Sequence, residues 1–534
     1  MRTEGESGVG CHTKSAHCCG YSLNSKRRTF TMDLAASGAF EDLQLAAEDW
    51  ASANGLLVRR EGGFQTCPIT LIPSIFPRQT YEEAIALQPI FNRLVDRVSR
   101  DLSWLYKELE ATGAGDDFIQ AQLEICKQVH GAQARGKNEK FQTTYLGCNR
   151  SDYMIHCAPE TEKDVPILPA ASGTPQGSFL QVELNTIASS FGSLSTQTSA
   201  LHKFLCTRHR DSVESAYAKL GLNVPPLTPE NLPETNTVNV LCQGMAEAFK
   251  HYQMQRGTDC VVRMLYIIFV VSDGEKNSVD QRMLEYELWN THQIPVLRHS
   301  LTTLATNATI ENRGGAPVLF VDGGTKEIAV VYYRDGYSPD AYPTKKEWDA
   351  RLLMEKSYAI KCPSITYQLV GAKKIQQALA GEGVLEKYLS ATDAIAIRKS
   401  FAGLYELTDE AVAAAMAHPE HFVLKPQREG GGNNVYGEDI TKVLPSLSTT
   451  ERAAYILMQR IFPPGQDSLL LLRGGLLMPC KALSELGVYG AFLGDEEEEH
   501  LNLTGGHLLR TKPDSSDEGG VAAGFAVIDS PCLL

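Results

Sequence analysis

The chain has 534 residues, which at roughly 150 residues per domain is enough for three or four structural units. Hydrophobic residues make up 43% and charged residues 21%, a composition that argues against intrinsic disorder and against a membrane protein. The net charge of -14 argues against a nucleic-acid-binding protein, because such proteins need a basic surface. The 13 cysteines include no C-x-x-C pair, so they indicate neither a disulfide framework nor a zinc site and favour a cytoplasmic location.

The first 31 residues are predicted to be a leader that precedes the globular sequence. They contain cysteines, lysines and arginines among serines and glycines, and Met32 opens a sequence typical of a globular domain. Two interpretations stay open: a plastid or mitochondrial transit peptide, or a disordered leader. Glu4 and Glu6 count against the transit peptide, because such peptides are poor in acidic residues.

Hydrophobic spacing predicts the elements that follow. Apolar residues spaced by three and four over residues 81–109 predict one amphipathic helix. Beyond it, strand-like runs alternate with helical stretches, which favours an α/β or α+β fold. The runs are 179–185, 261–271, 328–333, 422–425, 455–461 and 508–512. The run 261–271 is too short to span a membrane. Residues 222–237 and 307–317 are predicted linkers, 260–370 an inserted middle domain, and the acidic run 496–499 a solvated loop.

A glycine-rich run follows a predicted strand at 422–425. The sequence passes from Lys425 to three consecutive glycines at 430–432. Backbone N–H groups of glycines can close on phosphate oxygens and a lysine adds positive charge, so the run is typical of a phosphate-binding loop. It lacks the pattern of a P-loop or a Rossmann turn, and a surface turn is the alternative. Glu429 beside the glycines favours a bound cation, because a carboxylate otherwise repels phosphate.

A pair of oxygen ligands lies on the predicted strand 179–185. Strand alternation places Gln181, Glu183 and Asn185 on one face. A carboxylate and an amide oxygen side by side suit Mg²⁺, which fills its other positions with water and substrate phosphates. A solvated polar strand face is the alternative. The small residues at 188–190 offer backbone and hydroxyl contacts to a polar substrate.

Two further groups of charged residues lie at predicted strands. Arg334 and Asp335 follow a strand, with Gly336 in a turn, and the planar guanidinium suits a substrate carboxylate. A hairpin turn with a surface ion pair is the alternative. Arg510 and Lys512 share one face of another strand before a glycine-rich stretch, which suits an anionic ligand, whereas a solvated basic edge is the alternative. Taken singly, none of these motifs decides between its two interpretations.

Several long strings in one order carry a family resemblance. The strings include NRSDYM, QVELNTIASSFG, DQRMLEYEL, IAVVYYRDGYSP, FVLKPQREGGGNNVYG, SELGVYG and HLLRTK. From about residue 40 to its end, the chain resembles the eukaryotic glutathione synthetase family of ATP-grasp ligases. The resemblance implies an α+β ATP-grasp fold with an inserted α/β substrate-binding domain and a helical N-terminal region. It implies an N-terminal catalytic part with a helical dimer region at 32–259, the inserted domain at 260–370, and a C-terminal ATP-grasp part with a glycine-rich lid at 371–534.

The resemblance also implies a reaction and its participants. Members join γ-glutamylcysteine to glycine with ATP and Mg²⁺ through an acyl phosphate, in the second step of glutathione biosynthesis, and they are typically homodimers. The implied ligands of Mg²⁺, about two ions per site, are Glu183, Asn185 and Glu429. No nucleic acid or membrane partner is implied.

The residues that the resemblance assigns to substrates form two sets. Those implied to bind the nucleotide are Glu183, Lys373, Lys425, Pro426, Gln427, Arg428, Glu429, Gly430, Gly431, Gly432, Asn433, Asn434, Tyr436, Met458, Gln459, Arg460, Ile461, Glu485, Lys512 and Glu518. Those implied to bind the peptide are Arg150, Ile187, Ala188, Ser189, Ser190, Glu275, Lys276, Asn277, Gln281, Arg334, Asp335, Gly336, Tyr337, Arg510, Val521 and Ala522.

The predicted catalytic residues are Arg510, Lys425 and Arg150. Phosphorylation turns a carboxylate into an electrophile, and charge then develops on the phosphoryl group and on a tetrahedral intermediate. Such a site needs metals and fixed cations rather than a nucleophilic side chain. We therefore expect Arg510 to stabilise charge in the transition state.

Three residues depart from the family pattern, and two alternatives remain. Gln459 and Arg460 stand where the family usually has an acid and a lysine, and Glu518 stands where an aspartate is usual, so the affinity for ATP is open. Ala522 and Ala523 match the type that accepts glycine. The first alternative is the same ligase chemistry with β-alanine or serine as the acceptor. The second is a nucleotide or peptide binder without catalytic activity.

Overall fold

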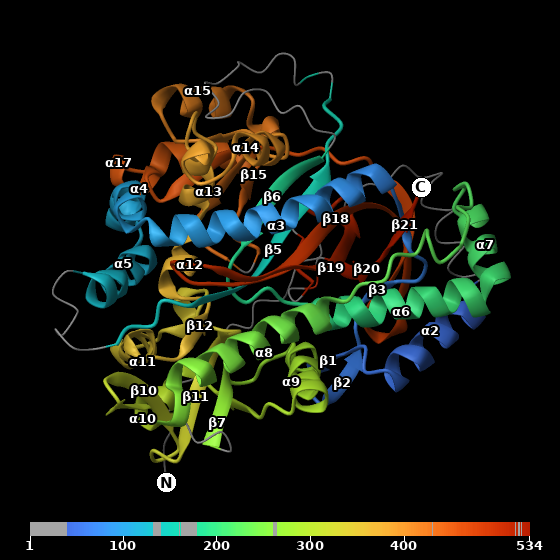
Figure 1. The fold of residues 1–534 in the computed structure, drawn as a ribbon. Helices are drawn as coiled ribbons and strands as arrows, with labels where there is room; N and C mark the ends of the chain where they lie inside the picture. The colour runs from blue at the N-terminus through green and yellow to red at the C-terminus, as the bar shows by residue number, and fades with distance from the viewer. Residues whose placement is uncertain are drawn as a thin grey trace, which may run out of the picture. The chain divides into compact units, whose positions relative to one another are not determined.

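The computed structural model describes residues 40–131, 140–159, 161, 179–259, 264–429, 431–517, 519–521, 524 and 526–534. The predicted leader at 1–31 lies outside these residues, as do Gly430, Glu518, Ala522 and Ala523. The described chain is a mixed helix and sheet structure with three larger sheets and two small ones (Figure 1). Among the described helices, none combines the length and the apolar character that crossing a bilayer requires.

Helix α2 (Glu41–Ala53) opens the described chain, and after four short strands come α3 (Arg78–Arg100), α4 (Leu102–Gly115) and α5 (Asp117–His130). The single helix predicted over 81–109 is wrong, because the chain breaks at Asp101. The Asp101 carboxylate accepts a hydrogen bond from the Trp104 backbone N–H at 3.1 Å and so begins α4. Asp116 begins α5 in the same way, accepting from the N–H groups of Phe118 and Ile119 at 3.0 Å each. The apolar faces of α3 to α5 pack in one hydrophobic core.

A seven-stranded sheet forms the centre of the described chain. Its order is β17 (Gln466–Leu471), β3 (Ile69–Thr70), β20 (Val527–Asp529), β19 (Glu499–Pro513), β18 (Leu477–Gly494), β5 (Tyr145–Ile155) and β6 (Phe179–Asn185). All neighbours are antiparallel except β20 and β3. Because β17 also pairs with β18, five of the strands close into a ring. The strands predicted at 179–185 and 508–512 are confirmed.

A bulge interrupts the alternation that the sequence predicts for β6. Asp152 on β5 pairs with Glu183, whereas the next residue, Tyr153, pairs with Gln181, so Val182 has no partner in the ladder. Gln181 is therefore buried rather than placed beside Glu183. The bulge turns Val182 toward the cavity described below.

A six-stranded sheet is built from residues 265–362. It contains β7 (Leu265–Val270), β8 (Val296–His299), β9 (Thr309–Arg313), β10 (Ala316–Val321), β11 (Lys326–Tyr333) and β12 (Ile360–Cys362). Its order is β8-β7-β11-β10-β9, with β12 also paired to β11, and β7, β8, β11 and β12 are parallel. The linker predicted at 307–317 is wrong, because β9 and β10 form a hairpin there. The helices around this sheet are α9 (Ser278–His292), α10 (Leu301–Asn307) and α11 (Lys345–Lys356).

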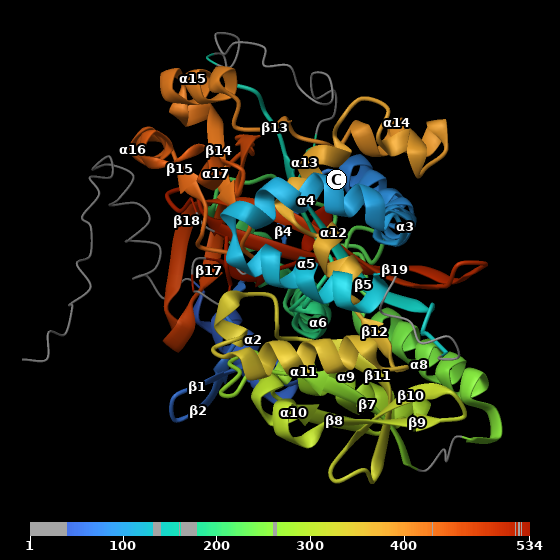
Figure 2. The same cartoon turned by 90° about the vertical axis from the view of Figure 1, so that its left-hand side faces the viewer.

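A four-stranded antiparallel sheet carries the glycine-rich segment. Its order is β13 (Leu404–Tyr405), β16 (Tyr455–Gln459), β14 (Phe422–Pro426) and β15 (Val435–Tyr436). The helices that lead into and around it are α12 (Ile365–Val370), α13 (Lys373–Leu379), α14 (Ala391–Arg398), α15 (Asp409–Ala417), α16 (Glu438–Val443) and α17 (Thr449–Arg452). In both views of the described chain, this sheet with α15 lies at one end and the six-stranded sheet at the other (Figure 1, Figure 2).

The remaining elements connect these sheets. They are the hairpin of β1 (Leu57–Arg60) and β2 (Gly63–Thr66), the pair of β4 (Ser74–Phe76) and β21 (Pro531–Leu533), and the helices α6 (Gly192–Arg208), α7 (Arg210–Lys219) and α8 (Thr237–Arg256). The linker predicted at 222–237 has no helix or strand before Thr237, which begins α8. Helix α8 packs on β18 and β19 and reaches β11, so it joins the central sheet to the six-stranded sheet.

Candidate active site

A cavity of about 230 Å³ lies where β5, β6, β18 and β19 meet the loop between β14 and β15. It brings together residues that the sequence predicted from separate motifs. The predicted residues that line it are Arg150, Glu183, Asn185, Ile187, Ala188, Ser189, Ser190, Tyr337, Lys425, Glu429, Gly431, Asn434, Tyr436, Glu485, Arg510, Lys512 and Val521.

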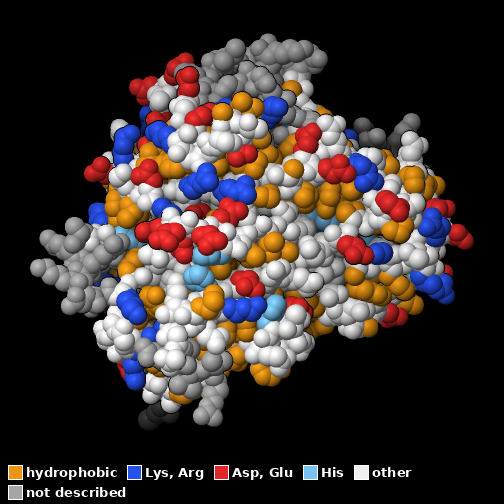
Figure 3. Space-filling view, in the orientation of Figure 1, with side chains coloured by type: hydrophobic (Ala, Val, Ile, Leu, Met, Phe, Trp, Pro, Cys, Tyr) orange, Lys and Arg blue, Asp and Glu red, His pale blue; other side chains and the backbone are white. Residues whose placement is uncertain are grey.

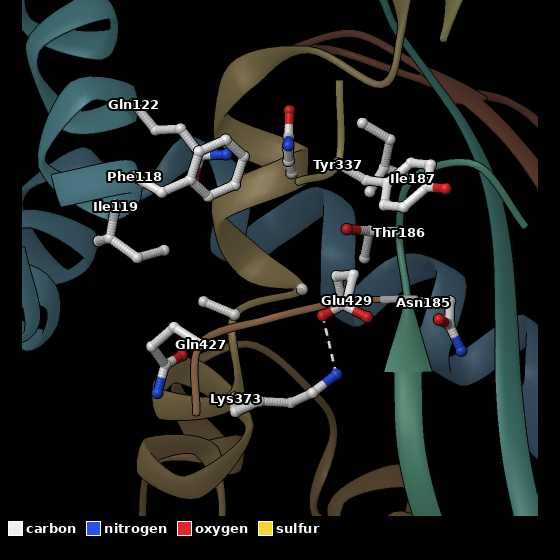
Figure 4. A pocket seen from close by; sticks show the side chains of 13 residues that line it. Phe118, Ile119, Gln122, Asn185, Thr186, Ile187, Tyr337, Lys373, Gln427 and Glu429 are labelled. Carbon is white, nitrogen blue, oxygen red and sulfur yellow. Dashed lines mark hydrogen bonds and ion pairs between the residues drawn. The ribbon is translucent and has the colours of Figure 1, made fainter. Parts of the chain in front are cut away.

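The carboxylates of Glu183 and Glu429, both predicted metal ligands, contact the same lysine. The Lys373 ammonium, at the first residue of α13, lies 3.1 Å from the Glu183 carboxylate and 2.7 Å from the Glu429 carboxylate. Figure 4 shows Lys373 reaching toward Glu429, with Asn185 at the end of β6 beside it. The Asn185 amide nitrogen donates to Glu183 at 3.3 Å and to Asp152 at 3.0 Å, which leaves the amide oxygen for another partner. Three oxygen-bearing side chains therefore converge at one point.

The charges around Lys373 control the protonation of its neighbours. Burial raises the pKa of Glu183, but the cations of Lys373 and Lys425 outweigh burial and hold that pKa well below its usual range. Burial raises the pKa of Glu429, and Lys373 opposes that rise. Burial lowers the pKa of Lys425 to about 8, with Glu183 opposing that change. Glu183 is thus a carboxylate at neutral pH, and Lys425 is a cation that titrates within reach of physiological pH.

A second charge network crosses the floor of the cavity. Both oxygens of Asp152 accept from the Arg150 guanidinium, at 2.7 and 2.8 Å, and one of them also accepts from Arg510 at 3.1 Å. Arg510 makes a further, very short contact with Glu485, its cross-strand neighbour. Asp152 is fully buried and, with Arg150, is held close to the partner strand because residue 487 is a glycine: a Cβ there would lie 2.7 Å from the Asp152 carboxylate. The two predicted catalytic arginines therefore share one aspartate.

The small residues after β6 form a constrained turn. Ala188 and Phe191 have φ angles of 51° and 71°, which non-glycine residues rarely adopt. The Asp280 carboxylate holds the turn from behind, accepting from the backbone N–H groups of Phe191 at 3.0 Å and Ser193 at 2.8 Å. The Ser190 carbonyl oxygen accepts from Arg150 at 3.1 Å. The backbone at 188–190 is thus fixed against the cavity, in line with the predicted contact surface for a polar substrate.

The predicted residue Arg334 supports this turn rather than lining the cavity. It is 4% exposed and donates to Asp280 at 3.0 Å, so the alternative of a surface ion pair is wrong. The nearby residues Glu275 and Gln281 also contact each other, at 2.9 Å. Among the predicted peptide-binding residues at 275–277, 281 and 334–337, Tyr337 alone lines the cavity.

The predicted phosphate-binding segment is the loop that joins β14 to β15. Gly431 and Gly432 have φ angles of 74° and 77°, a conformation that favours glycine. A Cβ on Gly431 would lie 3.9 Å from the Cα of Gly520, so this loop and the glycine-rich C-terminal stretch lie next to each other where both line the cavity. Lys425 lines the same cavity, and its ammonium donates to the Val182 carbonyl oxygen at 2.9 Å. Val182 is the bulged residue of β6, so the bulge makes this contact possible.

A second cavity of about 110 Å³ adjoins the first and contains the residues predicted to border the adenine. Met458, Gln459, Arg460 and Ile461 line it with Lys425, Asn434, Tyr436 and Lys512. The Gln459 side chain turns to the backbone N–H of Gly403, which donates to it at 3.0 Å. The Arg460 guanidinium pairs with Asp517 at 2.7 Å, and its carbon lies 5.8 Å from the centre of the Tyr436 ring. Gln459 and Arg460, two of the three residues that depart from the family pattern, therefore have partners in the fold.

A third, small cavity shares Asn185 and Glu429 with the first (Figure 4). Several predicted site residues line none of the three cavities. They are Pro426, Arg428, Gly432, Asn433, Glu275, Lys276, Asn277, Gln281, Arg334, Asp335 and Gly336. Arg428 instead pairs with Asp116 at the start of α5, and the Lys276 carbonyl oxygen accepts from the backbone N–H of Arg59 at 2.9 Å. Lys373 and Gln427 line the small cavity. The grouping by motif thus mixed residues that face the cavity with residues that support it.

Two aspartates important to the site were not predicted from the sequence. Asp152 follows Arg150 by two residues and so shares its strand face, a signal that alternation within NRSDYM offered. Asp280 lies within DQRMLEYEL on α9 and reaches the turn at 188–191 only through the fold.

Comparisons with known proteins identify relatives of the chain. The sequence model of the family described as eukaryotic glutathione synthase, ATP binding domain, matches residues 37–533. The chain is 41% identical over 500 residues to a protein of Solanum lycopersicum named glutathione synthetase, chloroplastic, covering 91% of this chain and 83% of that protein. It is 39% identical over 505 residues to the glutathione synthetase of Homo sapiens, covering 92% and 96%.

A solved structure shares the fold at lower sequence identity. The apo form of a glutathione synthetase-like effector from Globodera pallida superposes with a TM-score of 0.68 at 22% identity, covering 92% of this chain and 96% of that chain. That likeness concerns the fold alone, whereas the sequence matches extend over nearly the whole chain. The chain therefore belongs to the eukaryotic glutathione synthase family.

Proposed function

We propose that the chain catalyses the ATP-dependent ligation of γ-glutamylcysteine and glycine, giving glutathione, ADP and phosphate. The observation that carries the proposal is the meeting of Glu183, Glu429 and Lys373 beside the glycine loop. Two carboxylates and a lysine next to a phosphate-binding loop suit the handling of a nucleoside triphosphate. Family membership supports the same reaction.

The donor set at Lys373 fits Mg²⁺. Two carboxylates and the Asn185 amide oxygen are the hard oxygen ligands that this ion prefers, with water and phosphates completing its shell. The carboxylates already attract one cation, the Lys373 ammonium. We propose that Glu183, Asn185 and Glu429 hold the ion, which when bound would neutralise charge on the ATP phosphates.

The reaction divides into two transfers. A carboxylate oxygen of γ-glutamylcysteine attacks the γ-phosphorus of ATP, forming an acyl phosphate and releasing ADP. The glycine amine then attacks the acyl carbon, forms the C–N bond, loses a proton and expels phosphate. Lys425 and Lys512 would attract the phosphates, and Arg510, fixed by Asp152, would face the charge that develops on the transferring group.

The peptide substrate would lie on the turn at 188–190. The Arg150 guanidinium is buried and held bidentately by Asp152, so its orientation is fixed before substrate arrives. The backbone of the turn is constrained by Asp280 from the other side. This preorganisation would align the reacting carboxylate with the γ-phosphate.

The proposal extends to architecture and assembly. We propose that the four-stranded sheet and part of the seven-stranded sheet form an ATP-grasp fold, with 260–370 as an inserted substrate-binding domain and 32–259 and 371–534 as the catalytic parts. The confinement of β7 to β12 to one sheet supports that division. A homodimer is proposed from the family resemblance, and its test is the mass of the chain in solution.

The names of two relatives bear on the location of the chain. We propose plastid targeting by residues 1–31, because relatives from Solanum lycopersicum and Arabidopsis thaliana carry chloroplastic in their names. A fluorescent protein fused behind residues 1–31 should enter plastids if this is right. A signal in mitochondria or in the cytoplasm would instead support one of the other two locations.

The acceptor-dependent release of phosphate tests the proposed function. Purified chain with Mg²⁺, ATP and γ-glutamylcysteine should release phosphate many times faster when glycine is added. A higher kcat/KM with β-alanine than with glycine would change the acceptor, and ATP binding without phosphate release would indicate a binder rather than a ligase.

A further inference from the structure

A cluster of metal-binding side chains lies outside the catalytic cavity. His251 on α8 and Asp495 and His500 at the tip of the β18–β19 hairpin each offer one ligand atom, and these atoms all lie within 4.8 Å of one another. The imidazole rings of His251 and His500 have centres 4.4 Å apart. The Asp495 carboxylate lies 2.8 Å from the His500 ring nitrogen Nε2. None of the three lines the cavities of the active site.

The turn at the hairpin tip fixes the Asp495 carboxylate. Its Oδ1 accepts from the backbone N–H groups of Glu497 and Glu498, at 2.9 Å each, and its Oδ2 faces His500. The side chains of Asp495 and His500 are each 20% exposed, so an ion could reach them from solvent. A fourth group, the Glu498 carboxylate, lies 3.8 Å from His500 Nδ1. The carboxylate and the imidazole are thus held in place without an ion.

His251 adds an independent observation from another element. In the part of the chain that the structure describes, its ring nitrogens make no hydrogen bond, although its ring lies close to that of His500 at an interplanar angle of 41°. Helix α8 packs along β18 and β19, which keeps His251 over the hairpin tip. A half-buried imidazole without a hydrogen-bond partner, beside a second imidazole and a carboxylate, supplies the donor types that first-row metal ions bind.

The ligand types select the class of ion. Two imidazoles with one carboxylate suit Zn²⁺ and related first-row ions, with water as a fourth ligand, whereas Mg²⁺ prefers oxygen ligands alone. The neighbouring acidic residues Glu496 and Glu497 are exposed and add negative charge that attracts a cation. Figure 3 shows acidic side chains gathered beside histidines on the face over this tip.

We propose that His251, Asp495 and His500 bind one Zn²⁺-class ion that joins the β18–β19 hairpin tip to α8. The interpretation of 496–499 as a plain solvated loop would then be incomplete, since the run flanks a coordination site. The ion is distinct from Mg²⁺ of the proposed reaction. It would fasten the strands that carry Glu485 and Arg510 at the end remote from the catalytic cavity.

Zinc titration of full-length, tag-free protein tests this site. Chelator-treated protein is titrated with Zn²⁺ against a chromophoric chelator, with excess Mg²⁺ present to occupy oxygen-only sites. We expect one Zn²⁺ per chain, and His251→Gln and His500→Gln should each weaken binding at least about tenfold. Co²⁺ in place of Zn²⁺ should give visible absorption typical of nitrogen ligands, which the same variants lose.

Two control variants separate this site from others. Glu497→Gln removes an exposed charge from the same turn, and Glu183→Gln removes a carboxylate of the active site. Both should bind Zn²⁺ as tightly as the wild type. The proposal is overturned if wild-type protein binds no Zn²⁺, if the histidine variants bind it as well as wild type, or if Glu183→Gln is the variant that loses it. Unchanged ligase activity of His251→Gln and His500→Gln in Mg²⁺ would verify that both variants fold.

Discussion

The two sides of the catalytic cavity use charged residues differently. On the seven-stranded sheet, Glu183 and Arg510 face the cavity, whereas beside the six-stranded sheet Arg334 and Asp280 lie buried against each other under the turn at 188–191. The sequence assigned Arg334 to substrate on the same grounds as Arg510. The difference teaches that a family motif identifies a site without separating side chains that meet the ligand from those that hold the backbone.

The largest expected effect is on the supporting side. Asp280→Ala leaves the buried Arg334 charge unpaired and removes the acceptor of three backbone N–H groups, so we expect a loss of about 3–5 kcal/mol in the free energy of unfolding. Denaturant unfolding measures this loss. Asp280→Asn, which keeps the shape and an acceptor oxygen, should lose less. If Asp280→Ala unfolds like the wild type but has lost activity, Asp280 belongs to the chemistry and the contrast between the two sides fails.

The cavity side should show the opposite pattern. Glu429→Gln removes a proposed metal ligand, so kcat should fall by about 10²- to 10³-fold. Its side chain is half-buried, burial raises the pKa of its carboxyl group, and Lys373 keeps Glu183 as a partner, so thermal stability should change little. Steady-state kinetics and a melting curve check both parts. Glu438→Gln, an exposed residue close by in the chain, is the matched control and should change neither quantity.

A glycine at the centre of the charge network gives an intermediate effect. Gly487→Ala would place a Cβ 2.7 Å from the Asp152 carboxylate and 2.9 Å from Arg150 Cδ, so one of these buried side chains must shift. We expect about 1–3 kcal/mol of destabilisation and a higher KM for γ-glutamylcysteine, because Arg150 loses its fixed orientation. Unchanged KM would mean that the Arg150–Asp152 pair is not part of the peptide site.

The smallest expected effect is a proton linkage at Lys425. Burial lowers its pKa to about 8, so the ammonium is charged below about pH 8 and loses its proton above. Bound triphosphate favours the charged form and raises the pKa, so ATP binding at about pH 8.5 should take up part of a proton. Calorimetry in two buffers of different ionisation enthalpy measures this uptake. Lys425→Arg stays charged at that pH, and equal uptake by this variant would place the titrating group elsewhere.

Local patterns predicted much of this structure, and long-range contacts supplied the rest. Alternation located Glu183 and Asn185, and consecutive glycines located the loop between β14 and β15. The bulge at Val182 depends on the register with β5, and that register is invisible in the strand itself. Apolar spacing alone predicted one continuous helix. The Asp101 side chain instead caps the start of a second helix, and the first helix ends before it.

The linker predicted at 307–317 failed for a related reason. Its polar residues belong to a hairpin at the edge of the six-stranded sheet, where exposed strands also carry polar side chains. Asp280 reaches the site only because α9 packs against the start of α6. The family resemblance therefore located the site, and the fold separated its lining from its support.

The fate of a carboxylate oxygen tests the central claim most directly. γ-Glutamylcysteine labelled with ¹⁸O in the reacting carboxyl group is ligated to glycine with ATP, and the released phosphate is analysed by mass. An acyl phosphate keeps a labelled oxygen between carbon and phosphorus, so each phosphate should carry one ¹⁸O when glycine displaces it. Unlabelled phosphate alongside newly formed glutathione would contradict the acyl phosphate route.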